Sequence, residues 1–197
     1  TGSMLGCSQP GLKVWVQNTF NSNRKYPYSW ELVQTNNNIL VGINTLLSNK
    51  LVREGIEINK IPEIQNYDAI KTEVRYGKEN SRIDLLLKSN TQPDCFVEVK
   101  NVTMVENKIA YFPDAVSQRG LKHLRELIDN VNCGNRSIIF FCIQRNDATS
   151  FSPAHQIHPE YAKLLKEAAN SGVETLAYTC NLTTTKLEIK SPVPVRF

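Results

Sequence analysis

The sequence predicts an α/β protein in which helices cover one mixed sheet, preceded by a small β unit. From residue 43 onward, helical and strand-like patterns follow one another in the order α-β-β-β-α-β-α-β. The run RSIIFFCIQ (136–144) is apolar almost throughout, as expected of a central strand buried on both faces. Before residue 42 the strand-like pieces are short and separated by turn residues. We therefore expect a β unit over residues 1–41 and an α/β domain over residues 42–197.

Each helix of the larger domain has its own signal. Leucines and valines at helical spacing predict a helix over 43–55, with Asn44 or Thr45 as its cap. A second helix is predicted from Pro113 and Asp114 to about Val131, with Asp114 offsetting the helix dipole. A third is predicted from Pro159 to Gly172.

The strands of the larger domain are predicted from short apolar runs bounded by turn residues. TEVRY (72–76), RIDLLLK (82–88) and CFVEVKN (95–101) are joined by short turns and should form an antiparallel meander. VETLAYTC (173–180) and KLEIK (186–190) are predicted to follow the last helix as further strands. These elements together make up a mixed sheet.

Composition limits the classes of protein. Of 197 residues, 41% are apolar and 21% charged, which is typical of a globular chain. The five cysteines are scattered and form no C-x-x-C, so we expect a reducing, cytoplasmic environment and no structural zinc. No apolar run is long enough to span a bilayer and no leader is visible, so we expect no membrane association. The net charge of +4 only weakly favours an anionic partner.

Polar residues interrupt two of the predicted strands. Glu98 and Lys100 share one face of their strand, because side chains alternate. If Asp84 pairs opposite Glu98, all three side chains converge, and Arg82 lies across from Lys100. A slip of one residue would separate Asp84 from the other two.

Neighbouring carboxylates in a sheet require compensating positive charge. Lys100 supplies part of it, and Mg²⁺ or Mn²⁺ held by Asp84, Glu98, the Val99 carbonyl and waters would supply the rest. Lys100 would then orient a water or help to deprotonate it, as in a phosphodiesterase. The alternative is an exposed edge strand on which Glu98 and Lys100 form an ordinary salt bridge.

Other residues extend this site. Glu54, late in the first helix, is a candidate third metal ligand, although such a residue is more often exposed. Arg119, Lys122 and His123 are predicted on the helix face opposite Leu121 and could contact phosphates, with Gln118 as a polar companion. The alternative for this group is a solvated helix face.

A second candidate surface lies in the β unit. Arg24, Lys25 and Tyr26, with Tyr28 and Trp30 nearby, interleave basic and aromatic groups as single-strand binding sites do. The alternative is that Trp30 and one tyrosine are core residues. His155 and His158 lack partner ligands in the sequence and are predicted to be surface residues.

Longer motifs add a family resemblance. Asp84 followed by Glu98-Val99-Lys100 after a helix resembles the PD-(D/E)xK nuclease superfamily, in which Asp and Glu bind metal and Lys assists water. Further stretches throughout the chain resemble the sugar fermentation stimulation protein A (SfsA) family: TGSMLGC, RKYPYSWELV, NKLVREG, SRIDLLL, FVEVKNVT, FPDAVSQRGLKHLREL and IHPEYAKLLKEAANSGVE. The resemblance implies a restriction-endonuclease-like core after a partial OB-like β unit, since family members begin upstream of TGSMLGC. It also implies DNA binding linked to sugar metabolism.

We therefore expect a cytoplasmic DNA-binding protein with a Mg²⁺-dependent phosphodiesterase site at Asp84, Glu98 and Lys100. Its DNA contacts, Arg82 included, should be mostly independent of sequence and suited to single-stranded or structured DNA. The alternatives are a non-catalytic DNA-binding regulator of sugar-metabolism genes with a vestigial nuclease-like pocket, and a protein-interaction module. The oligomeric state is left open, a homodimer included.

Overall fold

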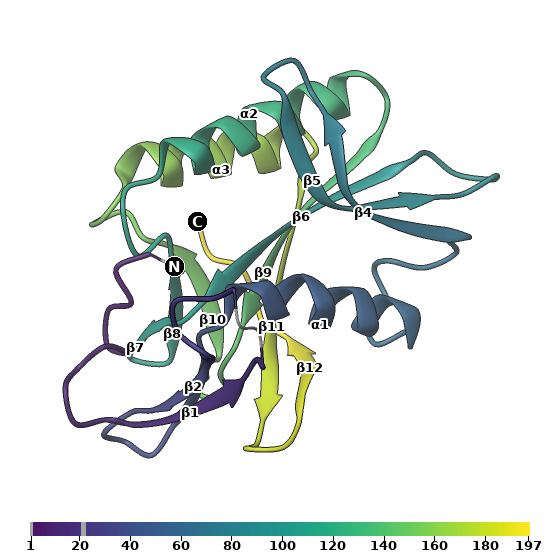
Figure 1. Ribbon diagram of the computed structural model, residues 1–197. Coiled ribbons are helices and arrows are strands. Elements are labelled where there is room, and N and C mark those ends of the chain that lie inside the picture. Colours follow the sequence, from purple (N-terminus) through teal and green to yellow (C-terminus); the bar gives the residue numbers. More distant parts are fainter. Residues whose placement is uncertain (1, 21–22) are drawn as a thin grey trace.

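The computed structural model describes residues 2–20 and 23–197 (Figure 1). Its helices are α1 (Thr45–Glu57), α2 (Gln118–Asn132) and α3 (Pro159–Asn170). Its strands are β1 (Lys13–Asn18), β2 (Tyr28–Gln34), β3 (Leu40–Gly42), β4 (Ala69–Tyr76), β5 (Ser81–Lys88), β6 (Cys95–Val102), β7 (Met104–Glu106), β8 (Ile109–Phe112), β9 (Arg136–Ile143), β10 (Ser150–Pro153), β11 (Glu174–Leu182) and β12 (Leu187–Pro192). No helix in the described ranges is long and apolar enough to cross a membrane.

A six-stranded mixed sheet forms the centre of the larger domain, in the order β12-β11-β9-β6-β5-β4. β4, β5 and β6 form the predicted antiparallel meander, whereas β9 runs parallel to both β6 and β11. Helix α1 covers one face of this sheet, and α2 and α3 cover the other (Figure 1). The predicted α/β fold class is confirmed.

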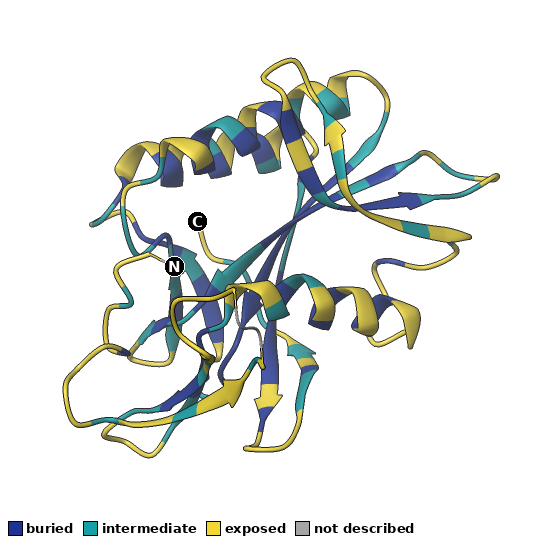
Figure 2. Cartoon of the chain, in the orientation of Figure 1, coloured by how far each residue is buried: buried dark blue, intermediate teal, exposed yellow. Residues whose placement is uncertain are grey.

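Strand β9 separates two hydrophobic cores. Phe140 packs in the core beneath α1, and its neighbour Phe141 packs in the core beneath α2 and α3. Every residue of β9 after Arg136 is buried, and Figure 2 shows the central strands in dark blue. A strand flanked by parallel neighbours and covered by helices on both faces must be apolar in both directions, which confirms the prediction from RSIIFFCIQ.

The N-terminal unit is a three-stranded antiparallel sheet, β1-β2-β3, with a small core around Cys7, Val33 and Val41. It is joined to the larger domain where β3 ends. The Gly42 amide donates to the Gln144 carbonyl at 2.8 Å. The Asn44 side-chain amide donates to both carboxylate oxygens of Glu31, at 3.1 and 2.8 Å, and its carbonyl oxygen accepts from Leu46 N–H as the N-cap of α1. This confirms Asn44 as one of the two predicted caps.

The start of α2 differs from the prediction. The helix begins at Gln118, after Ser117, whose hydroxyl accepts from the Gly120 amide at 3.0 Å. Asp114 lies outside the helix, and its carboxylate accepts from the Met4 amide at 2.8 Å. Asp114 is therefore engaged by the N-terminal segment, and the better-placed Ser117 provides the N-cap.

A second small sheet, in the order β10-β8-β7, was not predicted. Its strands have only three or four residues, too few for a periodic pattern to be recognised. β8 pairs with β10 in parallel across about forty residues of sequence, a contact that no local pattern reveals. Its strands β7 and β8 lead the chain from β6 to α2, and the end of β8 lines the candidate site.

Candidate functional site

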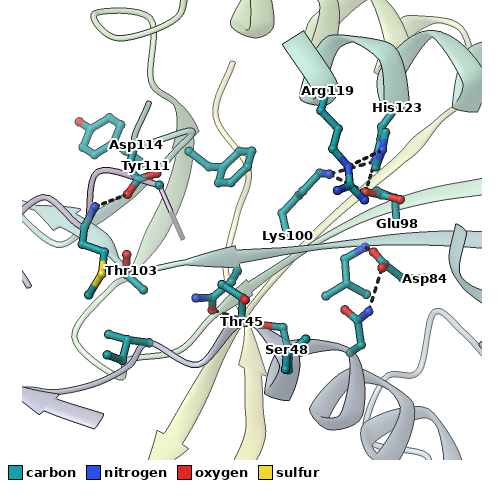
Figure 3. A pocket seen from close by; sticks show the side chains of 18 of the residues that line it. Thr45, Ser48, Asp84, Glu98, Lys100, Thr103, Tyr111, Asp114, Arg119 and His123 are labelled. Carbon is teal, nitrogen blue, oxygen red and sulfur yellow. Dashed lines mark hydrogen bonds and ion pairs between the residues drawn. The ribbon is translucent and has the colours of Figure 1, made fainter. Parts of the chain in front are cut away.

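Asp84, Glu98 and Lys100 line one pocket of about 380 Å³ (Figure 3). Its walls come from the start of α1, from β5 and β6, and from the first turns of α2. The N-terminal segment closes the far side, where Gly2 and Met4 face the pocket beside Asp114. The three residues predicted from the sequence thus meet in a recess that both parts of the chain build.

Asp84 lies where β5 and β6 separate. The two strands pair from Leu87 opposite Cys95 to Leu85 opposite Val97, and the same register continued by one step sets Asp84 opposite Glu98. Backbone pairing stops there. The Asp84 carboxylate instead accepts from the Val99 amide at 2.7 Å and from the Asn49 side-chain amide at 2.8 Å. The carboxylate therefore takes the place of a strand carbonyl and connects the sheet to α1.

Glu98 is almost fully buried, with 2% of its surface exposed. Its Oε1 accepts from the Lys100 ammonium and contacts His123 Nδ1. Its Oε2 is also buried and has no hydrogen-bond partner among the described residues. An unpartnered carboxylate oxygen in a low-dielectric environment is costly unless a cation or a donor from a ligand reaches it.

His123 is not on the exposed helix face where it was expected. It is 4% exposed and turns toward the sheet. Its Nε2 accepts from Arg119 Nε at 3.2 Å, which places the ring hydrogen on Nδ1 for donation to Glu98. Lys100 Nζ lies 3.3 Å from the same Nδ1. One turn of α2 thus connects Arg119, which is exposed at the pocket, to the buried carboxylate (Figure 3).

The two acids have different electrostatic environments. Burial, followed by the nearby charge of Glu98, raises the pKa of Asp84 to about 6 against the hydrogen bonds from Val99 and Asn49. Burial also opposes ionisation of Glu98, but the Lys100 ammonium and the His123 hydrogen bond outweigh it and hold the pKa of Glu98 below its ordinary value. At neutral pH both are carboxylates, and Asp84 is the one closer to protonation.

Glu54 does not take the place predicted for it. It is exposed and does not line the pocket. Helix α1 presents Ser48 and Asn49 to the site, and Glu54, five residues after Asn49, is rotated by roughly 140° around the helix axis. The rotation of α1 about its axis, set by its packing on the sheet, determines which residues face the pocket. The helical pattern in the sequence did not specify this rotation.

The remaining predicted contacts are spread over the surface. Arg82 is exposed and pairs with Arg75 across β4 and β5. The β5–β6 pairing ends at Leu85 and Val97, so Arg82 is not paired with Lys100 as predicted. Lys122 is half-buried and donates to the Glu79 carbonyl, while Gln118 is exposed. Neither of these two α2 residues lines the pocket. From this helix face, the pocket receives only Arg119 and His123.

The aromatic residues of the N-terminal unit are on its surface. Tyr26 is 66% exposed, Tyr28 55% and Trp30 37%, so the alternative that Trp30 and a tyrosine are core residues is not met. Arg24 donates to the Ser29 hydroxyl at 2.8 Å, and Lys25 lies 5.5 Å from the centre of the Tyr26 ring. Basic and aromatic groups are thus together and accessible.

The prediction that His155 and His158 are surface residues is confirmed for His155 and wrong for His158. His155 is exposed as expected, but His158 is buried, and its Nδ1 accepts from the Ser117 amide at 3.4 Å. His158 therefore supports the loop that precedes α2.

A buried polar network next to the pocket was not predicted. The Gln144 side-chain amide donates to Ser48 Oγ at 3.0 Å and to Asn101 Oδ1 at 2.8 Å, and Ser48 also donates to Asn101. Asn101 directly follows Lys100, which is the only sequence signal that could have indicated it. The network fixes the start of α1 against the end of β6.

The donor set suits a hard cation. Asp84 and the free oxygen of Glu98 are oxygen ligands, and Mg²⁺, Mn²⁺ and Ca²⁺ prefer such ligands. In the part of the chain that the structure describes, no three His, Cys, Asp or Glu side chains are grouped closely enough to hold a metal by themselves. Backbone carbonyls, waters or an anionic ligand would have to complete the coordination.

Comparison with known proteins agrees with this architecture. Residues 46–186 match the sugar fermentation stimulation protein RE (restriction endonuclease-like) domain, and residues 1–43 match the SfsA N-terminal OB domain. The structure of Pyrococcus furiosus SfsA in complex with Ca²⁺ is similar with a TM-score of 0.90 and 28% identity, over 100% of this chain and 83% of that chain.

A more distant similarity is to the small subunit of the heterodimeric restriction endonuclease R.BspD6I, with a TM-score of 0.31 and 13% identity over 66% of this chain and 62% of that one. The family matches cover nearly the whole sequence, across the N-terminal sheet and the domain that holds the pocket. The chain belongs to the sugar fermentation stimulation protein (SfsA) family.

Proposed function

We propose that this protein binds DNA and cleaves its phosphodiester bonds with the help of a divalent cation, at the pocket of Asp84, Glu98 and Lys100. The observation that carries the proposal is the free Oε2 of Glu98. It is buried and unpartnered among the described residues, and Glu98 itself lines a pocket together with a second acid and a lysine. Such an arrangement is stable when a cation completes it.

Divalent binding has independent support. The donors are oxygen atoms, and the related P. furiosus protein was solved in complex with Ca²⁺. Ca²⁺ and Mg²⁺ share a preference for carboxylate and carbonyl ligands, although Mg²⁺ requires stricter octahedral geometry. Bound at Asp84 and Glu98, Mg²⁺ or Mn²⁺ would stabilise the negative charge that develops on a phosphate during hydrolysis.

The protein's own side chains divide the remaining work. Lys100 is held at the pocket by Glu98 Oε1, where its ammonium can orient a water or a phosphate oxygen. Arg119 is exposed at the pocket, and a guanidinium recognises phosphate through paired hydrogen bonds. His123 holds Glu98 and does not itself contact DNA in this proposal.

Contacts with the DNA strand outside the pocket are assigned to groups at the protein surface. Arg24, Lys25 and Tyr26 of the N-terminal unit offer charge and a stacking ring, as single-strand sites do. Arg82, Gln118 and Lys122 lie on the larger domain and would contact phosphates. Such contacts do not distinguish base sequences, and they weaken as salt increases.

The test is cleavage by the purified protein of single-stranded, duplex and branched DNA, with Mg²⁺, with Mn²⁺ and with EDTA. We expect metal-dependent cleavage that is lost in Asp84→Ala and in Lys100→Met, both checked for folding by circular dichroism. Arg53→Ala serves as a control, since Arg53 forms an exposed ion pair with Glu57 away from the pocket.

The outcomes separate the alternatives. Cleavage that persists in Asp84→Ala would show a contaminating nuclease or a different site. Salt-sensitive DNA binding without cleavage under any condition would favour the non-catalytic regulator. Absence of both binding and cleavage would refute the DNA proposal altogether.

A further inference from the structure

Glu73 has an unusual backbone for a residue inside a strand. It lies in β4 with φ of +54°, in the left-handed region that non-glycine residues seldom occupy. The pairing of β4 with β5 proceeds from Thr72 opposite Leu85 to Val74 opposite Ile83 and omits Glu73 and Asp84 between them. The strained residue is therefore the direct neighbour of the proposed metal ligand.

This irregularity changes which face the strand presents. Leu85 packs in the core beneath α1, whereas Ile83 and Val74 pack in the core beneath α2. In a regular strand, residues 83 and 85 would lie on the same face. The two strands therefore exchange the faces they present to the helices at Glu73 and Asp84, and this exchange explains the positive φ of Glu73. It does not explain why the residue at position 73 is a glutamate, because glycine adopts positive φ without this strain.

The charge of the pocket provides a reason for a carboxylate side chain at position 73. Glu73, Asp84, Glu98 and Asp114 all line it, whereas its lysines and arginines are Lys100 and Arg119 alone. Glu73 is exposed, and its side chain makes no hydrogen bond or ion pair within the described residues. Acids outnumber these cations, and Glu98 Oε2 is buried without a partner among the described residues. An anionic DNA strand could enter such a pocket only if divalent cations reverse its charge.

We propose that Glu73 is a further acidic residue of the divalent-cation site, and that its strained backbone is kept because a carboxylate is required beside Asp84. Glu73 acts through the water shell of the cation, because among the described residues no three acidic side chains are grouped closely enough to hold a metal by themselves. The inference rests on the proposed metal-dependent function. It adds a residue from β4 to a site otherwise built by β5 and β6.

The test compares Glu73→Gly and Glu73→Gln with Asn80→Gly in the full chain. Asn80 also has positive φ, at 56°, in the turn of the same hairpin, and it is exposed and does not line the pocket. Each glycine variant should raise the melting temperature of the metal-free protein by about 2–4 °C, because strain is relieved. Both Glu73 variants should weaken Mn²⁺ binding, measured by calorimetry without DNA, about tenfold or more. Asn80→Gly should leave Mn²⁺ binding unchanged.

The failures are distinguishable. If the wild-type protein binds no Mn²⁺, Mg²⁺ or Ca²⁺, the proposed function and this inference both fail. If the wild type binds Mn²⁺ and Glu73→Gln binds it equally well, only the role of Glu73 is refuted. If Glu73→Gly lowers the melting temperature of the metal-free protein, the argument from strain is refuted.

Discussion

At the scale of single residues, burial and neighbours decide what each acid of the pocket does. Asp84 and Glu98 have the same charged group, yet the pKa of Asp84 is raised to about 6 while that of Glu98 is lowered. Burial acts on both. The difference arises because Lys100 and His123 contact Glu98, whereas the hydrogen-bond donors to Asp84 are the neutral amides of Asn49 and Val99.

The first prediction concerns the pH dependence of stability. A carboxyl whose pKa is higher in the folded state binds its proton more tightly there, so folding loses stability as pH rises through that range. In EDTA, the free energy of unfolding of the wild type, relative to Asp84→Asn, should fall by on the order of 2 kcal/mol between pH 4 and pH 6. It should be constant above pH 7. Urea unfolding at several pH values measures this, and a flat difference would contradict it.

The second prediction concerns His123, which contacts Glu98 Oε1, while Oε2 has no partner in the described part of the chain. His123→Leu removes the donor and should weaken Mn²⁺ binding about 10- to 100-fold, as the loss of other metal-orienting partners does. His123→Asn places an amide near the position of Nδ1 and should restore part of the affinity. Calorimetry with Lys122→Ala as the neighbouring control decides the matter. Unchanged binding in His123→Leu would show that Glu98 needs no such support.

At the scale of elements, the site exists because β5 and β6 part where Asp84 lies. Their ladder ends at Leu85 and Val97, and Asp84 then bonds to the Val99 amide and to Asn49 of α1. Helix α1 therefore both covers one face of the sheet and, through Asn49, determines where the Asp84 carboxylate is held.

The third prediction concerns the start of α1. Asn44 caps the helix and also donates to Glu31 of β2. Asn44→Ala should reduce the free energy of unfolding by about 1 kcal/mol, whereas Asn44→Ser keeps a capping oxygen and should cost less. Urea denaturation compares the two variants. Equal losses would mean that the contact with Glu31, and not the cap, contributes most.

At the scale of the whole molecule, two distant parts of the chain enclose the pocket. The N-terminal segment is held where the Met4 amide donates to Asp114 and where Ser3 donates to the Asp114 carbonyl. These bonds join residues more than a hundred positions apart. The entrance to the site therefore depends on contact between the N-terminal unit and the loop before α2.

The fourth prediction tests this closure. Asp114→Ala should speed amide hydrogen exchange at Met4 and its neighbours while leaving exchange in β9 unchanged, because only the local opening free energy is lowered. Mass-spectrometric exchange on the full chain measures both regions. Faster exchange throughout the sheet would instead indicate that Asp114 supports the global fold.

Sequence reasoning succeeded where the signal is local and periodic. The β4–β5–β6 meander, the doubly buried β9 and the cap at Asn44 follow from alternation, apolar runs and capping preferences. It was wrong at the start of α2, because Asp114 is used by a segment that sequence proximity does not connect to it. The placement of Glu54 and His123 required the rotation of each helix about its axis, which the neighbouring layers set.

By itself the sequence determined the order of the main helices and strands, and it placed Glu98 and Lys100 on one face of their strand, because side chains alternate. Only the tertiary structure decided that β5 and β6 part so that Asp84 joins them, that Asn49 and His123 hold the two acids, and that Glu98 Oε2 has no partner among the described residues. It also decided that Glu73 is strained beside Asp84. The reason is physical. Periodicity specifies which face a side chain takes, but its partners depend on how separately formed layers pack together.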